Sequence, residues 1–268
     1  MKAPMDHLKR VADEFTRQAQ NFETWAAKAD HSRRFAAALG EMRRGKLLDV
    51  ACGPGLMTAA LALQAISVVA FDATEEMLKK ARARCAKIGL NNVTFKSGDA
   101  ENLPFNDDEF DGVVTRLAMH HFANPQRALD EMFRVLRPGG VAVIVDVVSS
   151  EDRDESKLHN AIERLRDPSH VRMLPASELD AGVSRAGFRN LEHATWDMDR
   201  ELEEWLAIVD DPARVEPMGT VIRTLAESGR TAGFGLSVNQ GRVVFFHRWR
   251  LIRANKPTAS HLDGCRDQ

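Results

Sequence analysis

The seven residues from Asp49 to Gly55, DVACGPG, follow a short apolar run and combine an acid with two glycines. Glycine has no Cβ atom, so backbone N–H groups near Gly53 and Gly55 can approach a ligand closely. The turn differs from the GxGxxG fingerprint of dinucleotide-binding proteins, because Thr58 stands three residues after Gly55 and the acid precedes the turn. An acid at this position suits a cationic amino group better than a pyrophosphate, which argues against a nicotinamide-dependent oxidoreductase.

Further acids follow the next two predicted strands. Asp72 ends SVVAF, where a carboxylate can accept two hydrogen bonds from a ribose diol, although an acid here can also be a plain helix N-cap. Asp99, Ala100 and Glu101 follow the third strand and could hold an adenine amino group and ring nitrogen; a solvated loop is the alternative. Met77 could pack on the same ring through its polarisable sulfur, or could belong to the core.

Three histidines are candidate general bases, since imidazole titrates near neutral pH and a positioned base contributes about 10²- to 10⁴-fold. His120 and His121 lie in RLAMHHF after the fourth predicted strand, where they could also simply pack and form hydrogen bonds. His170, in RDPSHVR, lies in a predicted cap that would face the substrate, and it ranks first among the three candidates.

The elements that must position these residues alternate between strand and helix. Apolar runs predict strands at residues 46–51, 67–71, 93–96, 110–115, 141–148, 188–197 and 242–250, with helical spacing between most of them. This alternation predicts an α/β, Rossmann-like, doubly wound and mainly parallel seven-stranded sheet, with the last strand antiparallel. Ligands of such sheets bind outside the carboxyl ends of the strands, where each of the motifs above falls.

The pattern of charged and apolar residues divides the chain into five regions. We expect a helical N-terminal lid at residues 1–40, a cofactor-binding core at 41–150 and a charged helical cap at 151–176. The rest of the core follows at 177–255, with a helical insertion at about 200–228, and residues 256–268 form a tail without apolar spacing that is expected to be disordered. The basic strand at 242–250 is expected at a solvated sheet edge.

Composition narrows the class of protein. The 37 Lys and Arg residues nearly balance 39 Asp and Glu, so no long-range field favours nucleic acid. There is no apolar run long enough for a membrane span and no secretory signal, which predicts a cytoplasmic protein without membrane partners. Three widely spaced cysteines fit neither a disulfide framework nor a CxxC metal site, so reduced thiols and no metal are expected. A homodimer is compatible with the sequence.

Four segments together carry a family resemblance: LLDVACGPGLMT, VVAFDATEEML, FKSGDAENLPF and FDGVVTRLAMHHFANPQRALDEMFRVLRPGGVAVIVD. In this order they resemble the successive motifs of class I S-adenosylmethionine-dependent methyltransferases, most closely those of the ubiquinone/menaquinone-biosynthesis type (methyltransferase domain 11). The resemblance covers residues 15–147 and fades after them, in the region where substrate identity is expected to be encoded.

The resemblance implies S-adenosylmethionine as cofactor and assigns it contacts residue by residue. Asp49 would lie near its amino group, Gly53 and Gly55 near its methionine moiety, and Asp72 at its ribose. The remaining implied contacts are Ala51 and Ala73 beside these acids, Met77, Asp99, Ala100 and Glu101 at the adenine, Arg116 beside the sulfonium, and Phe22 and Trp25 in the lid.

The implied reaction is an in-line displacement that moves a methyl group to an oxygen, nitrogen or carbon atom of a small organic molecule, with S-adenosylhomocysteine as product. Two alternatives remain open. A non-catalytic S-adenosylmethionine-binding regulator or partner protein would share the fold. The intact glycine turn predicts that the cofactor binds, but it does not distinguish such a protein from an enzyme. An RNA methyltransferase is the other, although the chain has neither an appended RNA-binding module nor an NPPY-like tetrapeptide.

Overall fold

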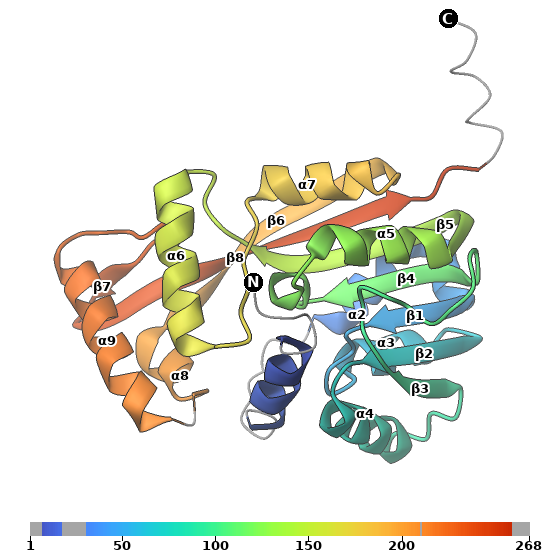
Figure 1. Cartoon of the computed structure of the whole chain (residues 1–268), viewed down its shortest axis with the longest axis horizontal. Helices are drawn as coiled ribbons and strands as arrows, with labels where there is room; N and C mark the ends of the chain where they lie inside the picture. The colour runs from blue at the N-terminus through green and yellow to red at the C-terminus, as the bar shows by residue number, and fades with distance from the viewer. Residues whose placement is uncertain (1–6, 18–30, 210, 259–268) are drawn as a thin grey trace, which may run out of the picture.

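The computed structural model describes residues 7–17, 31–209 and 211–258. Its described strands form one eight-stranded sheet in the order β3-β2-β1-β4-β5-β8-β6, with β7 paired to β8 (Figure 1). The strands are β1 (Lys46–Val50), β2 (Ser67–Asp72), β3 (Val93–Ser97), β4 (Phe110–Arg116), β5 (Leu136–Val148), β6 (Arg189–Glu201), β7 (Ser237–Asn239) and β8 (Arg242–Asn255). Strands β1 to β5 are parallel, and β8 is antiparallel to both of its neighbours β5 and β6. The predicted Rossmann-like sheet with an antiparallel last strand is confirmed; the short β7 was not predicted.

Helices cover both faces of this sheet. They are α2 (Ser32–Ala37), α3 (Leu56–Ala62), α4 (Glu75–Lys87), α5 (Pro125–Val135), α6 (Arg153–Arg166), α7 (Ala176–Arg185), α8 (Leu202–Leu206) and α9 (Pro212–Glu227). Residues 7–17 are also helical. Adjacent side chains of β1 lie on opposite faces of the sheet: Leu47 packs in a cluster with α2 and α3, whereas Leu48 packs with α5 and α7. Burial on both faces explains why the core strands are continuously apolar.

A second lobe extends from the core on the ends of β6 and β8, at the left of Figure 1. There α6, α8, α9 and β7 enclose their own apolar cluster, which includes Trp205, Met218, Ile222, Phe234 and Phe245. The cap segments predicted around residues 151–176 and 200–228 therefore come together in one lobe, while α7 packs beside α5 on the core. None of the described helices is long and apolar enough to cross a membrane.

The basic strand β8 is not the sheet edge that its composition suggested. It lies between β5 and β6, and its cations are neutralised by acids of neighbouring elements. Arg248 Nε donates to Asp197 on β6 at 2.8 Å, and Arg250 pairs with Asp180 of α7. The edge interpretation was wrong because sequence pattern alone cannot show whether a strand with polar residues is flanked on both sides.

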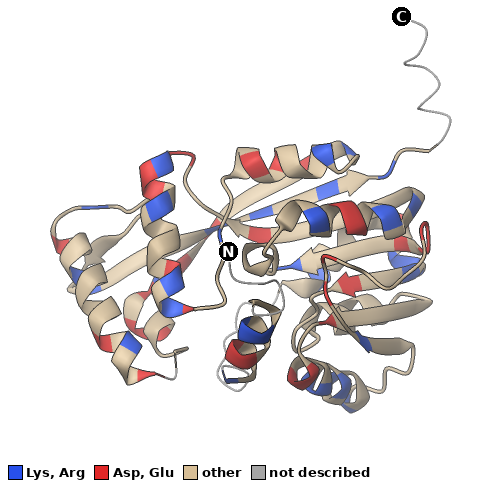
Figure 2. Cartoon of the chain, in the orientation of Figure 1, with Lys and Arg blue, Asp and Glu red and all other residues tan. Residues whose placement is uncertain are grey.

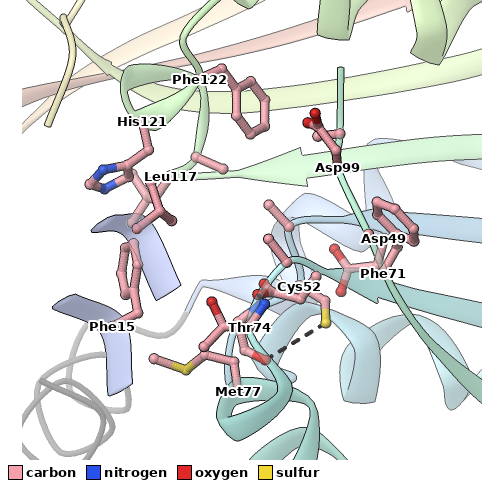
Figure 3. A pocket seen from close by; sticks show the side chains of 18 of the residues that line it. Phe15, Asp49, Cys52, Phe71, Thr74, Met77, Asp99, Leu117, His121 and Phe122 are labelled. Atoms are coloured by element: carbon pink, nitrogen blue, oxygen red, sulfur yellow. Dashed lines mark hydrogen bonds between the residues drawn. The ribbon is translucent and has the colours of Figure 1, made fainter. Parts of the chain in front are cut away.

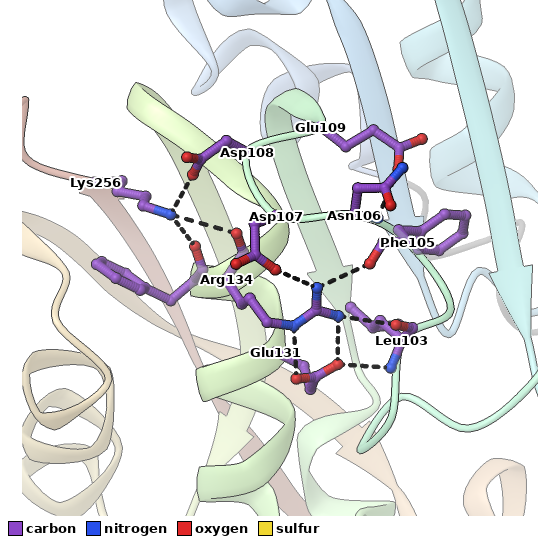
Figure 4. A network of polar contacts seen from close by, with 10 residues as sticks. Leu103, Phe105, Asn106, Asp107, Asp108, Glu109, Glu131, Arg134 and Lys256 are labelled. Carbon is purple, nitrogen blue, oxygen red and sulfur yellow. Dashed lines mark hydrogen bonds and ion pairs between the residues drawn. The ribbon is translucent and has the colours of Figure 1, made fainter.

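Arg134 on α5 ties the loop between β3 and β4 to the core (Figure 4). Its guanidinium donates to the Leu103 and Phe105 carbonyls at 2.9 and 2.8 Å, and to the carboxylates of Glu131 and Asp107. Glu131 in turn accepts from the Leu103 backbone N–H at 2.8 Å. The network anchors the segment that follows Asp99 and so helps to position one wall of the site described below.

We expect Arg134→Leu to lower the free energy of unfolding by about 2 to 3 kcal/mol, because it leaves the buried Glu131 carboxylate without its main partner. Urea denaturation followed by circular dichroism measures this loss. Lys79→Ala is the matched control, since it removes only an exposed ion pair with Glu76 and is expected to leave the urea midpoint unchanged. Equal midpoints for Arg134→Leu and Lys79→Ala would show that the network contributes no stability.

Candidate active site

The glycine turn after β1 has the conformation that its sequence requires. Gly53 and Gly55 have φ values of 53° and 79°, in the left-handed region that favours glycine. A Cβ atom on Gly53 would meet nothing within 4 Å, so the backbone at Gly53 is open to its surroundings. A Cβ atom on Gly55 would instead lie 2.7 Å from Cβ of Ala81 on α4, and Gly55 does not line the pocket. Unlike the other predicted contacts in this turn, Gly55 permits close packing of α3 against α4.

A pocket of about 1170 Å3 opens above the carboxyl ends of β1, β2 and β4 (Figure 3). It brings together nearly all of the predicted cofactor contacts: Asp49, Ala51, Gly53, Asp72, Ala73, Met77, Asp99, Ala100, Glu101 and Arg116. The helix at residues 7–17 covers one side with His7, Leu8, Val11 and Phe15, which the sequence did not single out. Phe22 and Trp25, the predicted lid residues, lie outside the described residues.

Two buried acidic side chains, Asp49 and Asp72, line the first pocket. Asp49 is 1% exposed and accepts a hydrogen bond from Thr58 Oγ1 at 2.5 Å; burial, with the nearby charge of Asp72, raises the pKa of Asp49 to about 7. Asp72 accepts from the backbone N–H groups of Gly53 and Thr74, each at 2.8 Å, and burial raises the pKa of Asp72 above its ordinary value. A ligand that brings positive charge would stabilise both ionised forms.

The other end of the first pocket combines apolar walls with backbone groups. Phe71 and Met77 are each 1% exposed, and Ala100 packs in the same core cluster as Phe71. Asp99 Oδ1 accepts from the Glu101 backbone N–H at 2.9 Å, which orders the loop. The Glu101 carboxylate accepts from the backbone N–H of Asn124, so part of its function is to hold the start of α5.

A second pocket of about 680 Å3 adjoins the first, and the two share Phe15, Leu117 and His121. It lies between the core sheet and the second lobe. Its remaining walls are His120, Val147, Glu163, Arg166, Asp167, His170, Met173, Arg200, Trp205, Ile208, His247 and Trp249. All three of the predicted histidines thus lie on this pocket, together with polar residues from α6, β6 and β8.

His120 forms a dyad with Asp146 of β5. Its Nδ1 lies 2.6 Å from Asp146 Oδ1, and because a carboxylate oxygen accepts, Nδ1 carries a proton and Nε2 is left as the basic nitrogen. Burial opposes protonation of this ring, but the charge and hydrogen bond of Asp146 outweigh it and raise the pKa of His120 above its ordinary value. Asp146 is a lone acid in the apolar run VIVDVV, a signal that was visible in the sequence and not used.

The surroundings of the other two histidines, His121 and His170, disfavour their protonation. Burial, followed by the charge of His120, lowers the pKa of His121 to about 4 and that of His170 to about 2. Nε2 of His170 lies 2.8 Å from Asn160 Oδ1, which accepts, so only Nδ1 of His170 can take up a proton. Both rings lie near His120, with centroid distances of 4.2 Å for His121 and 5.6 Å for His170.

Several residues of the second pocket were missed by sequence reasoning. The missed residues lie on α6, β6 and β8 and are up to 84 residues apart in the sequence: Glu163, Arg166, Arg200 and His247. They meet only because these three elements pack together in the fold. The spacing of His159 and Glu163, four residues apart on α6, was the one local signal available, because such residues share a helix face.

Comparison with known proteins places the chain in a family. Residues 48–144 match the methyltransferase domain family model. A methyltransferase of Bacillus subtilis named YcgJ, which is uncharacterised, is 33% identical over 196 residues, or 73% of this chain and 77% of that protein. This chain is a class I S-adenosylmethionine-dependent methyltransferase. A demethylmenaquinone methyltransferase of Clavibacter sepedonicus is 33% identical to this methyltransferase over 161 residues, 60% of this chain and 63% of the relative.

Solved structures agree with that assignment. The crystal structure of YcgJ superimposes on this methyltransferase with a TM-score of 0.77 at 31% identity, covering 85% of this chain and 99% of the other. A Bacillus halodurans protein whose structure is also named as a methyltransferase gives a TM-score of 0.79 at 32% identity, with the same coverage of both chains. The likeness therefore extends well beyond residues 48–144, which the family model matches.

Proposed function

We propose that this methyltransferase binds S-adenosylmethionine in the first pocket and methylates an oxygen, nitrogen or carbon atom of a small organic molecule held in the second. The observation that carries this proposal is the junction of the two pockets at Phe15, Leu117 and His121, with the His120–Asp146 dyad on the far side of it. The second pocket combines aromatic and apolar side chains with polar groups that could orient a small molecule.

The residues of the first pocket fit the cofactor by chemistry. The space beside Gly53 is open and would let a ligand approach the backbone closely, and Asp49 is a buried acid suited to the ammonium group of the methionine moiety. Asp72 would accept hydrogen bonds from the ribose, and Asp99 with Ala100 would hold the adenine. Arg116 lies 5.7 Å above the Trp249 ring, which places its cation beside the junction of the pockets.

The cofactor supplies a methyl group already activated on a sulfonium, so the protein has to position the acceptor and manage its proton. Alignment of two reactants contributes about 7 to 11 kcal/mol. His120 Nε2 would take the proton of a phenol, enol or carbon acid, and Asp146 would stabilise the imidazolium that forms. His170 and His121 then shape the same wall as neutral rings.

A small molecule fits this site better than RNA. The second pocket is lined on one side by the second lobe and includes the apolar side chains of Trp205, Ile208 and Trp249. Figure 2 shows Lys and Arg interspersed with Asp and Glu on the same helices, rather than gathered in one basic face. RNA-binding surfaces depend on such a basic face.

Transfer of labelled methyl groups tests the proposal. The protein is incubated with S-adenosylmethionine labelled in its methyl group and with separated small-molecule, RNA and protein fractions of a bacterial extract. We expect label in the small-molecule fraction, with transfer about 10²- to 10⁴-fold slower when His120 is replaced by alanine. Label found in RNA alone would overturn the proposed substrate class, and transfer to no fraction would favour a non-catalytic binding protein.

The affinity for S-adenosylmethionine should depend on pH through Asp49. The pKa of Asp49 is about 7 in the free protein, and an ammonium ligand favours the ionised carboxylate, so this acid must lose its proton on binding. Binding therefore weakens as pH falls below 7, by up to about tenfold per unit, while the cofactor's own amino group stays protonated. Asp72 and Arg116 are the other ionisable groups that act on Asp49.

Calorimetric titration between pH 5 and 7 checks this expectation. Asp49→Asn should bind more weakly than the unmodified protein at pH 7 and should lose most of the pH dependence, because an amide has no proton to release. A slope that persists unchanged in Asp49→Asn would assign the titration to another group.

A further inference from the structure

Three buried side chains meet at the wall of the second pocket: His159 and Glu163 from α6, and His247 from β8. They are 2%, 4% and 7% exposed. Glu163 Oε1 lies 3.0 Å from His247 Nε2 and 3.9 Å from His159 Nε2, and one potential ligand atom from each residue lies within 4.8 Å of the others. Within the described residues this is the one cluster of three such side chains.

His159 is the unexplained member of the cluster. Neither of its ring nitrogens has a hydrogen-bond partner, although the side chain is buried against Phe234, with ring centroids 4.3 Å apart. A buried polar group without a partner costs about 1 to 3 kcal/mol, and an apolar residue would fill this stacked position at no such cost. The imidazole is therefore expected to have a ligand that compensates for its burial.

We propose that His159, Glu163 and His247 bind one divalent transition-metal ion of the zinc class. Two imidazoles and a carboxylate are a donor set that suits zinc and its neighbours better than magnesium or calcium, which prefer oxygen ligands. Donor atoms around one tetrahedral zinc ion lie roughly 3.3 Å apart, as follows from bond lengths of about 2.0 to 2.1 Å. The two distances to Glu163 Oε1 bracket that spacing, so small side-chain rotations bring the ligands into place.

Neighbouring arginines orient this site and also limit its affinity. Arg166 Nε donates to Glu163 Oε2 at 2.9 Å, which fixes the carboxylate and leaves Oε1 directed at the histidines. Arg200 Nε donates to His247 Nδ1 at 3.4 Å. A metal on Nε2 requires the proton of His247 to be on Nδ1, so Arg200 must move on binding. Because two guanidinium groups oppose the added cation, we expect weaker binding than at a closed four-ligand zinc site.

The position of the cluster suggests what the ion contacts. Glu163 and His247 line the second pocket, so a metal with three protein ligands has a coordination position available on that side. An oxygen or nitrogen atom of the acceptor would complete the coordination there, and the ion would favour its deprotonated form. This last step rests on the proposed function, whereas metal binding itself does not.

Metal titration of the chelator-treated protein, without S-adenosylmethionine, tests the site. We expect one Zn²⁺ per chain by calorimetry, one Co²⁺ with the absorption bands of a four- or five-coordinate site, and no heat with Mg²⁺. His159→Leu and Glu163→Gln should each weaken Zn²⁺ binding by more than about tenfold. His193→Ala, an exposed histidine on β6, is the control and should bind as the unmodified chain does.

The stability of His159→Leu separates a lost ligand from a lost fold. Because leucine removes two unpartnered nitrogens, this variant should unfold at the same or a higher urea concentration when no metal is present. The site is refuted if the unmodified protein binds no zinc at one equivalent, or if His159→Leu binds it equally well. Neither result depends on methyl transfer, so failure here leaves the proposed function untouched.

Discussion

Replacing Asp72 by alanine should weaken S-adenosylmethionine binding by about 100-fold or more. Two hydrogen bonds from a ribose to a buried charged acceptor contribute about 1.5 to 3 kcal/mol each. The same carboxylate accepts from the backbone N–H groups of Gly53 and Thr74, so its loss also loosens the glycine turn that faces the cofactor. Calorimetric titration with S-adenosylmethionine and S-adenosylhomocysteine measures the change, and both ligands should lose affinity alike because they share the ribose.

Asp130→Asn is the control for this experiment, since Asp130 is an exposed acid on α5 that accepts a hydrogen bond from Gln126 Nε2 at 2.9 Å. It should bind both ligands as the unmodified protein does. Far-ultraviolet circular dichroism confirms that Asp72→Ala is folded. If folded Asp72→Ala retains affinity within about threefold, the ribose does not bind at the tip of β2 and the cofactor occupies another orientation.

His120→Ala should lower kcat by about 10²- to 10⁴-fold while leaving the dissociation constant for S-adenosylmethionine within about threefold. The dyad has one nitrogen committed to Asp146 and one available as a base, and no other histidine of the pocket has a raised pKa. Turnover is measured with the acceptor identified by the labelling experiment. His170→Ala should also lower turnover, by about tenfold, because its ring packs near His120 and loss of that packing disturbs the base.

The pH profile distinguishes a base from a structural histidine. His120 must be neutral to accept a proton, so kcat should rise with pH as this group loses its proton, at a pH above that of an ordinary histidine because its pKa is raised. In Asp146→Asn the stabilising charge is gone, and the rise should move to lower pH with a reduced plateau. The other ionisable groups facing or acting on His120 are His121, Glu163, Asp167 and His170. An unchanged profile in Asp146→Asn would remove the dyad from the mechanism.

The cofactor half of the site followed from local sequence because its geometry is imposed by the sheet. Parallel strands end at one edge, so acids placed at the carboxyl ends of β1 and β2 and just after β3 must converge there whatever the rest of the chain does. Asp49, Asp72 and Asp99 accordingly line one pocket. Gly55 shows the limit of this reasoning, since a glycine needed for helix packing has the same sequence pattern as one that faces a ligand.

The acceptor half depended on contacts between segments far apart in the chain. His120 and Asp146 meet because β4 and β5 are neighbours, while Glu163 and His247 meet only because β8 runs past α6 after the second lobe has formed. The hydrophobic periodicity of the sequence does not predict these contacts, because the side chains involved are isolated polar residues on helices and strands whose pattern is otherwise typical. The amino-acid sequence by itself thus determined the methyltransferase class and the cofactor pocket, through motifs of short range. Tertiary structure alone decided which histidine is paired with an acid and which residues line the second pocket, since long-range packing sets those distances.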